Sequence, residues 1–124
     1  QYSAKEVKVT HPALLIRINR LFRFGMSPVE LYDTTRGFWK VGERRENAKF
    51  ALALFDGIVQ EVYEVMDWYP AGTTFSTREC INPEKRWEFV GAIAEEKVRR
   101  RYRFKSVRKE FPKGSSNPIR YVKA

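Results

Sequence analysis

Residues 50–65 read FALALFDGIVQEVYEV, and this stretch decides the fold. Two runs of strand-forming residues flank Asp56-Gly57, a dipeptide that favours a two-residue hairpin turn because both of its residues can take positive φ. The first arm, residues 50–55, is apolar on both faces, which predicts a central strand covered from both sides. The second arm is expected to be more exposed, because it contains Gln60, Glu61 and Glu64.

Further strands and short helices are expected on both sides of this hairpin. Ser27-Pro28-Val29-Glu30 has the spacing of a capping box with proline at the first helical position, which predicts a helix that runs through Thr35. Residues 43–49 are expected to form a turn of helix or a loop, and residues 67–85 a long loop that starts with Trp68 and Tyr69. The remaining pattern predicts strands over 13–19, 38–42, 86–94 and 119–122 and short helices over 95–102 and 106–111.

These elements together predict an α+β fold. By the rule that domains are built from packed layers, we expect a small mixed or antiparallel, barrel-like sheet of about five or six strands with short helices at its ends. The 124 residues are expected to form a single domain, 1–124, in which residues 1–10 are a flexible N-terminal segment.

The composition indicates a soluble, cytoplasmic protein. No window approaches the roughly 18 apolar residues that a membrane span needs, and the first residues lack the apolar region of a signal peptide. The single cysteine, Cys80, permits no internal disulfide and fits a reducing compartment. We therefore expect no membrane partner.

Positive charge is concentrated at the C-terminal end of the sequence. Residues 97–124 contain eleven Lys and Arg residues against one acid, Glu110, whereas residues 1–96 contain thirteen bases and fourteen acids. In the expected helix 95–102, Val98 and Tyr102 should face the core, and the arginines Arg99, Arg100 and Arg103 should point away from it. A localised basic surface with interleaved aromatic residues is typical of nucleic-acid binding.

The candidate contacts to nucleic acid fall into three groups. The expected phosphate contacts are Arg99, Arg100, Arg101, Arg103, Lys105, Arg108 and Lys109. A second, smaller basic cluster consists of Arg44, Arg45 and Lys49, and the fold would make a groove if it brought this cluster beside the first. Trp68 and Tyr69 are the candidates for holding a base, because they open an irregular loop.

The sequence offers little for catalysis or for a metal. One histidine, His11, and one cysteine cannot supply the ligands of a zinc site, and no cofactor motif is present. The carboxylates show no recognised catalytic spacing, and they are most simply read as solvated or ion-paired groups. We therefore expect no enzyme activity, no metal and no cofactor.

Several stretches carry a resemblance to a known family: residues 30–37, 39–48, 50–54, 56–59, 62–65, 68–72, 86–91 and 117–122. Their order resembles an accessory domain associated with bacterial LEM-like endonucleases of the GIY-YIG superfamily and with stand-alone relatives. The Gly-Ile-Tyr and Tyr-Ile-Gly motifs of the cleaving domain are absent, so no catalytic residue is carried over. The hairpin also resembles PUA-like barrels, including EVE and ASCH domains, several of which bind RNA or modified DNA bases in an aromatic pocket. The resemblance implies a PUA-like fold and a role in handling DNA or RNA.

Three hypotheses for function follow from these observations. The first is a non-catalytic module that binds DNA or RNA and is accessory to a nuclease. The second is a protein-interaction or structural module whose basic C-terminal face docks on an acidic partner or on its own oligomer, such as a homodimer. The third is an enzyme or small-ligand protein built on a PUA-like pocket, which would need a cleft lined by Trp39, Trp68 or Trp87.

Overall fold

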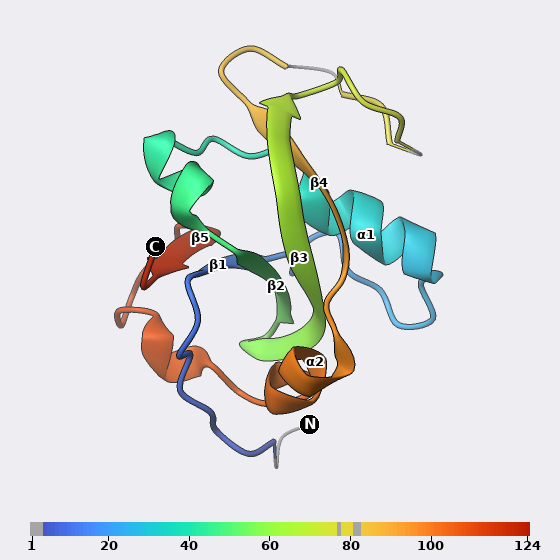
Figure 1. Cartoon of the computed structure of the whole chain (residues 1–124). Coiled ribbons are helices and arrows are strands. Elements are labelled where there is room, and N and C mark those ends of the chain that lie inside the picture. The colour runs from blue at the N-terminus through green and yellow to red at the C-terminus, as the bar shows by residue number, and fades with distance from the viewer. Residues whose placement is uncertain (1–3, 77, 81–82) are drawn as a thin grey trace.

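The fold is built on one five-stranded mixed sheet in the order β4-β3-β2-β1-β5 (Figure 1). The structure is a computed structural model and describes residues 4–76, 78–80 and 83–124. The strands are β1 (Ala13–Arg17), β2 (Phe50–Phe55), β3 (Ile58–Pro70), β4 (Trp87–Ile93) and β5 (Ile119–Val122). The helices are α1 (Pro28–Arg36) and α2 (Glu96–Tyr102), and the 3-10 turns are η1 (Glu43–Asn47) and η2 (Arg108–Glu110).

The strand pairing confirms the α+β class and corrects the expected barrel. β1 and β2 are parallel, and the other neighbouring pairs are antiparallel. Within the described ranges, β4 and β5 lie at opposite edges of the sheet, which is therefore open and not closed into a barrel. A parallel pair requires a crossover connection, and α1 with η1 lies in the stretch between β1 and β2.

The central hairpin forms as predicted, except that its second arm is buried. Asp56 and Gly57 take φ values of 53° and 76°, so both turn residues lie in the left-handed region. In β2, residues 50–54 are all buried, as expected for a strand covered on both faces. The expectation that the second arm is more exposed is wrong for Gln60 and Glu61, which are only 6% and 4% exposed where α2 lies against β3, whereas Glu64 is half-buried.

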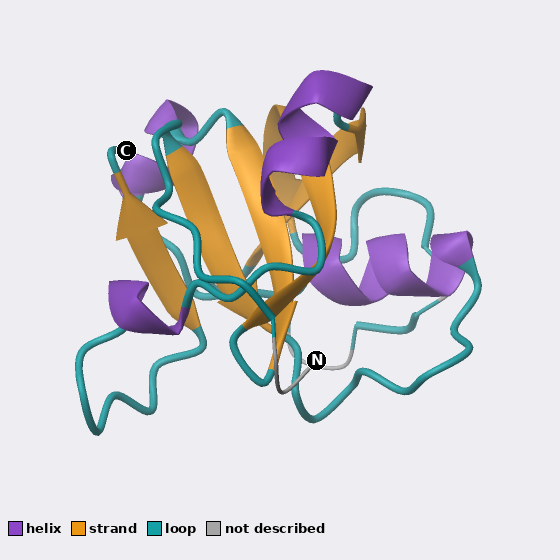
Figure 2. Cartoon of the chain, turned by 90° about the horizontal axis from the view of Figure 1, so that it is seen from below, coloured by secondary structure: helices purple, strands orange, loops and turns teal. Residues whose placement is uncertain are grey.

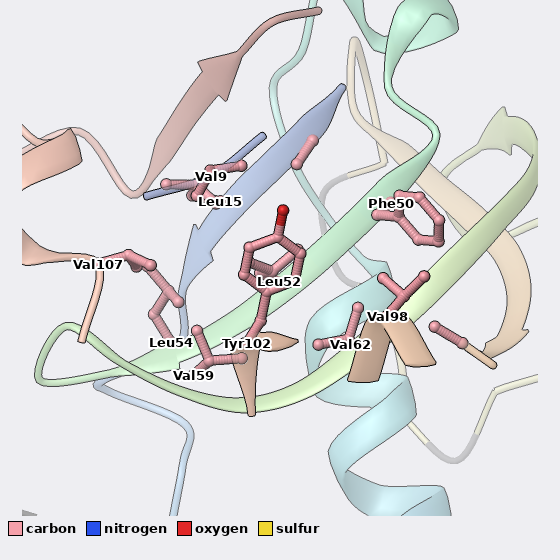
Figure 3. Packing of buried hydrophobic residues seen from close by; sticks show 12 residues of the cluster. Val9, Leu15, Phe50, Leu52, Leu54, Val59, Val62, Val98, Tyr102 and Val107 are labelled. Atoms are coloured by element: carbon pink, nitrogen blue, oxygen red, sulfur yellow. The ribbon is translucent and has the colours of Figure 1, made fainter. Parts of the chain in front are cut away.

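Two hydrophobic clusters occupy the two faces of the sheet, and the helices around the strands cover them (Figure 2). Side chains alternate along β1, so that Leu15 belongs to one cluster while Leu14 and Ile16 belong to the other. The first cluster includes α2 residues and has Tyr102 at its middle (Figure 3). α1 packs against the second cluster through Leu31 and Tyr32.

The helix α1 begins as its sequence predicts. The Ser27 side chain accepts a hydrogen bond from the Glu30 amide, and the Glu30 carboxylate accepts one from the Ser27 amide. This reciprocal pair is a complete capping box, with Pro28 at the first helical position. After the helix, the expected strand over 38–42 is reduced to one bridge between Trp39 and Trp87.

β3 is longer than the sequence pattern suggests. It continues to Pro70, which pairs with Trp87 of β4, so Trp68 and Tyr69 lie on a strand and do not open a loop. The connection to β4 starts at Ala71, and residues 77, 81 and 82 of the expected loop lie outside the described residues.

The N-terminal segment packs against the domain. Val9 is 1% exposed and belongs to the first cluster, and the amide of Val7 donates to the carbonyl of Ser106. The expectation that residues 1–10 are flexible is therefore wrong for residues 7–9, whereas residues 1–3 are outside the described part of the chain. Across the described residues, no helix has the length and apolar character needed to cross a membrane.

Candidate nucleic-acid interface

The helix α2 is anchored to the sheet by apolar residues and by an ion pair. Val98 and Tyr102 are buried, as the helical spacing predicts. Arg99 turns toward β3, where its Nε and Nη2 donate to the two carboxylate oxygens of Glu61 at 2.7 and 3.0 Å. The hydrogen bond to Glu61 raises the pKa of the Arg99 guanidinium, because the buried carboxylate favours the charged form.

Arg103 is tied to the same site. Its Nε donates to the carbonyl oxygen of Gln60 at 3.0 Å and lies 3.8 Å from the Glu61 carboxylate. The expectation that Arg99 and Arg103 point away from the core is therefore wrong, because both side chains turn toward the buried Glu61. A buried carboxylate on β3 needs a cation, and two are supplied here, Arg99 from α2 and Arg103 directly after the helix.

Two further predicted contacts have acidic neighbours on the surface. The Nη2 atom of Arg108 lies 3.2 Å from Asp56 Oδ2, and the Nζ atom of Lys109 lies 3.0 Å from Glu6 Oε2. Exposed pairs of this kind are weak, so the cations can exchange partners, but each positive charge is locally offset.

The remaining cations of this segment line a concave surface, which we call the α2 hollow. It has a volume of about 700 Å³ and lies between α2 and the N-terminal segment. Arg100 is 78% exposed, and its only ion pair among the described residues is a long contact of 4.0 Å with Glu96. The charged and titratable residues that line the hollow are Lys97, Arg100, Arg101, Lys105, His11, Glu95 and Glu96.

Arg101 is held in one orientation at this surface. Its Nη2 donates to the carbonyl oxygen of Lys8 at 3.1 Å, and its guanidinium lies 5.4 Å from the centroid of the Tyr102 ring. Both contacts leave its charge without an acidic partner among the described residues. A guanidinium fixed in this way can bind an anion with little further loss of side-chain freedom.

The Tyr102 hydroxyl joins the hollow to the core. It accepts a hydrogen bond from the Thr10 amide at 3.0 Å and lies 2.5 Å from His11 Nδ1. His11 was not a candidate from the sequence, because its pairing with a residue 91 positions away has no local signal.

The second predicted basic cluster is divided by the fold. The Lys49 Nζ lies 5.6 Å from the centroid of the Phe50 ring, and that ring contacts His11 edge to face at 5.4 Å. Lys49 thus lies near His11 but is not among the residues that line the α2 hollow. Arg44 donates instead to the carbonyl oxygen of Ala124, and Arg45 stacks over Trp87 at 3.6 Å, so neither extends the hollow.

The two predicted base-holding residues have different positions. Trp68 is 6% exposed, packs edge to face on Phe89 and donates its Nε1–H to the Arg45 carbonyl, so it is a core residue with no free face for a base. Tyr69 is 40% exposed. It lies seven residues along β3 from Val62, which belongs to the same cluster as Val98 and Tyr102 of α2. Seven residues of extended strand span about 23 Å. Figure 1 shows this end of β3 far from α2.

A second hollow, of about 580 Å³, lies at the end of β1. Trp39 lines it together with Arg17, Asn19, Arg20, Ser116 and Pro118. The Trp39 Nε1–H is already donated to the Thr35 carbonyl at 2.7 Å, so the residue offers the hollow only ring surface. Of the three tryptophans considered for a ligand pocket, Trp39 is the one that lines a described hollow of this size.

No group of three or more His, Cys, Asp or Glu residues that could hold a metal ion occurs among the described residues.

Comparisons with known proteins identify no relative of this chain. No family model matches it, and no curated protein or solved structure matches it at a significant level.

Proposed function

We propose that this chain binds nucleic acid through the α2 hollow and does not cleave it. The observation that supports the proposal is the gathering of four cations, Lys97, Arg100, Arg101 and Lys105, in one concave surface. Arg99, Arg103, Arg108 and Lys109 all have acidic neighbours, whereas Lys97, Arg101 and Lys105 have no ion pair among the described residues. The resemblance to nuclease-accessory and PUA-like domains favours the same class of partner.

The number of free cations sets the expected salt dependence. Each phosphate neutralised on duplex DNA lowers the logarithm of the association constant by about 0.9 per logarithmic unit of salt. If all seven predicted cations of the C-terminal segment made contacts, the slope would be about −6. The ion pairs in the structure reduce the expected number of contacts to about three or four, which gives a slope of about −3.

Fluorescence anisotropy tests this proposal with labelled single-stranded and double-stranded DNA and RNA. The test variant is Arg100→Gln with Lys105→Gln, and the matched control is Lys40→Gln with Arg120→Gln, which removes the same charge from exposed positions that do not line the hollow. We expect the test variant to bind at least about tenfold more weakly and the control to bind like the original chain. Absence of binding at low salt, or equal loss in both variants, would refute the proposal.

The alternative is a module that docks on an acidic protein surface or on a second copy of the chain. The α2 hollow would attract these partners through the same charges. Light scattering in the presence and absence of oligonucleotide separates the two cases. A stable dimer whose mass does not change when oligonucleotide is added would favour the interaction module.

A further inference from the structure

We propose that the α2 hollow binds the terminal phosphate of a nucleic-acid strand, a phosphomonoester, in preference to the phosphodiesters within the strand. This inference rests on the proposed nucleic-acid binding and adds the part of the nucleic acid that is recognised. Three properties of the hollow support it: its charge, its boundaries and its donors.

The charge of the hollow matches a phosphomonoester. Its lining contains four Lys and Arg residues and two carboxylates, Glu95 and Glu96, so the cations of these residue types exceed the anions by two. A phosphomonoester carries about −1.5 to −2 at neutral pH, whereas an internal phosphodiester carries −1. A terminal phosphate therefore neutralises the site, and a single internal phosphate leaves part of the positive charge uncompensated.

The boundaries of the hollow are unsuited to a strand that continues in both directions. Glu95 and Glu96 lie at the start of α2, and Arg100 and Arg101 lie about one helical turn further on. A backbone that passed through would bring its next phosphate toward these carboxylates. Among the cations of the C-terminal segment that lie outside the hollow, Arg99 is held by the buried Glu61, whereas Arg108 and Lys109 make exposed pairs with Asp56 and Glu6. Lys97, Arg100, Arg101 and Lys105 thus form a compact cluster at the hollow.

The donors in the hollow suit an anion with three free oxygens. Arg100 can donate two parallel hydrogen bonds to a phosphate, Arg101 can add the terminal N–H groups that Lys8 does not use, and Lys97 and Lys105 are mobile point charges. His11, which Tyr102 holds at the same surface, also lines the hollow. A phosphomonoester has three terminal oxygens to accept these bonds, one more than a phosphodiester.

The test compares oligonucleotides of one sequence that differ only at their ends. Each carries an internal fluorophore and has a 5′-phosphate, a 3′-phosphate or hydroxyl groups at both ends. We expect at least one phosphorylated form to bind about tenfold or more tightly than the hydroxyl form. Inorganic phosphate should compete with the phosphorylated form at lower concentrations than chloride does.

Matched variants assign the preference to the hollow. Lys97→Gln with Arg100→Gln removes two exposed cations, and we expect it to abolish the preference for the phosphorylated form. Lys40→Gln with Arg120→Gln should keep it. Arg101→Gln should also abolish it, with the far-ultraviolet circular dichroism spectrum confirming that each variant is folded.

The outcomes separate this inference from the proposed function. Equal binding of phosphorylated and hydroxyl-ended oligonucleotides, lost in the Lys97→Gln, Arg100→Gln variant, would overturn the terminal-phosphate inference and leave nucleic-acid binding intact. A preference that persists in that folded variant would also overturn the inference, because the phosphate would then bind elsewhere. No binding of any oligonucleotide would overturn both.

Discussion

Arg99 and Glu61 are joined by two parallel hydrogen bonds, at 2.7 and 3.0 Å, that fasten α2 to β3. Glu61 is 4% exposed, so water hardly reaches its carboxylate. Arg99 instead supplies hydrogen bonds and the opposite charge that a buried carboxylate needs. The pair explains why α2, a helix of only two turns, is held at a fixed position on the sheet. The same pair fixes which face of α2, and therefore which arginines, remain available to a ligand.

Replacing the carboxylate should weaken the domain measurably. Glu61→Gln removes the negative charge and one of the two strong acceptors, and we expect the free energy of unfolding to fall by about 2 kcal/mol. The full effect of a buried ion pair is not expected, because Arg99 is partly exposed and can turn toward water. Urea denaturation measures the change. Glu96→Gln, which removes an exposed carboxylate, is the control and should change stability by less than about 0.5 kcal/mol.

Charge reversal at two neighbouring arginines should have opposite consequences. Arg99→Glu places a second carboxylate beside Glu61, and we expect a loss of about 3 kcal/mol in unfolding free energy. The Arg100 side chain is 78% exposed, so Arg100→Glu should change the free energy of unfolding by less than about 0.5 kcal/mol. The same substitution should weaken oligonucleotide binding. Thermal melting and anisotropy on both variants check this. Similar melting temperatures for the two variants would contradict the assigned role of Arg99.

The Tyr102 hydroxyl should contribute less to stability than its ring. Tyr102→Phe leaves the Thr10 amide and His11 Nδ1 without their partner, and we expect a loss of about 1 kcal/mol, since both groups can reach water. Tyr102→Ala also removes the ring from the middle of the first cluster, and we expect a loss of about 4 kcal/mol. Denaturant titration of both variants gives the two values. Equal losses would show that the hydroxyl network is the main contribution of this residue.

Tyr63 should make the fold sensitive to alkaline pH. Burial, assisted by the negative charge of Glu61, raises the pKa of Tyr63 well above its ordinary value. A tyrosine with a raised pKa in the folded state stabilises the fold at every pH below its unfolded value and loses that contribution as the pH rises above about 10. Tyr63→Phe should therefore lose less stability between neutral and strongly alkaline pH than the original chain does. Tyr69→Phe, at an exposed position, is the control and should follow the original chain.

A small addition at Gly91 should disturb the pairing of β3 with β4. A Cβ atom at this position would lie 2.1 Å from the carbonyl oxygen of Glu64, which is backbone and cannot move aside cheaply. We expect Gly91→Ala to cost about 2 kcal/mol in unfolding free energy. Gly42→Ala is the matched control, because no atom lies within 4 Å of a Cβ there. If calorimetry finds the same stability in both variants, the close approach of the two strands is not as the structure describes it.

The sequence predicts those parts of the fold whose signals are local. The Asp56-Gly57 turn and the capping box at Ser27 each depend on residues within a few positions of one another, and both form as predicted. Local signals mislead where distant residues supply a partner. The charged residue Glu61 suggests that its strand is exposed. The neighbouring sequence gives no signal that Arg99, which lies 38 positions away, will pair with it.

The candidate site, like the fold, could be predicted only where its signals are local in the sequence. The sequence locates the basic segment, but the ion pairs that remove Arg99, Arg103, Arg108 and Lys109 from it come from other elements. The sequence places Trp68 at the start of a long loop, whereas pairing with Phe89 of β4 keeps it in a strand. His11 enters the hollow only because the N-terminal segment packs beside α2.

The pairing of β1 with β5 has a consequence for how the chain reaches its folded state. Ala13 pairs with Val122, so the sheet is completed by contacts between opposite ends of the sequence. Contacts this far apart make folding slow, because the loop between them must be ordered before the pairing can stabilise it. Until β5 arrives, β1 presents an apolar strand with an unpaired edge to other chains. Aggregation during synthesis or refolding should therefore depend more on the timing of the last strand than on the stability of the finished domain.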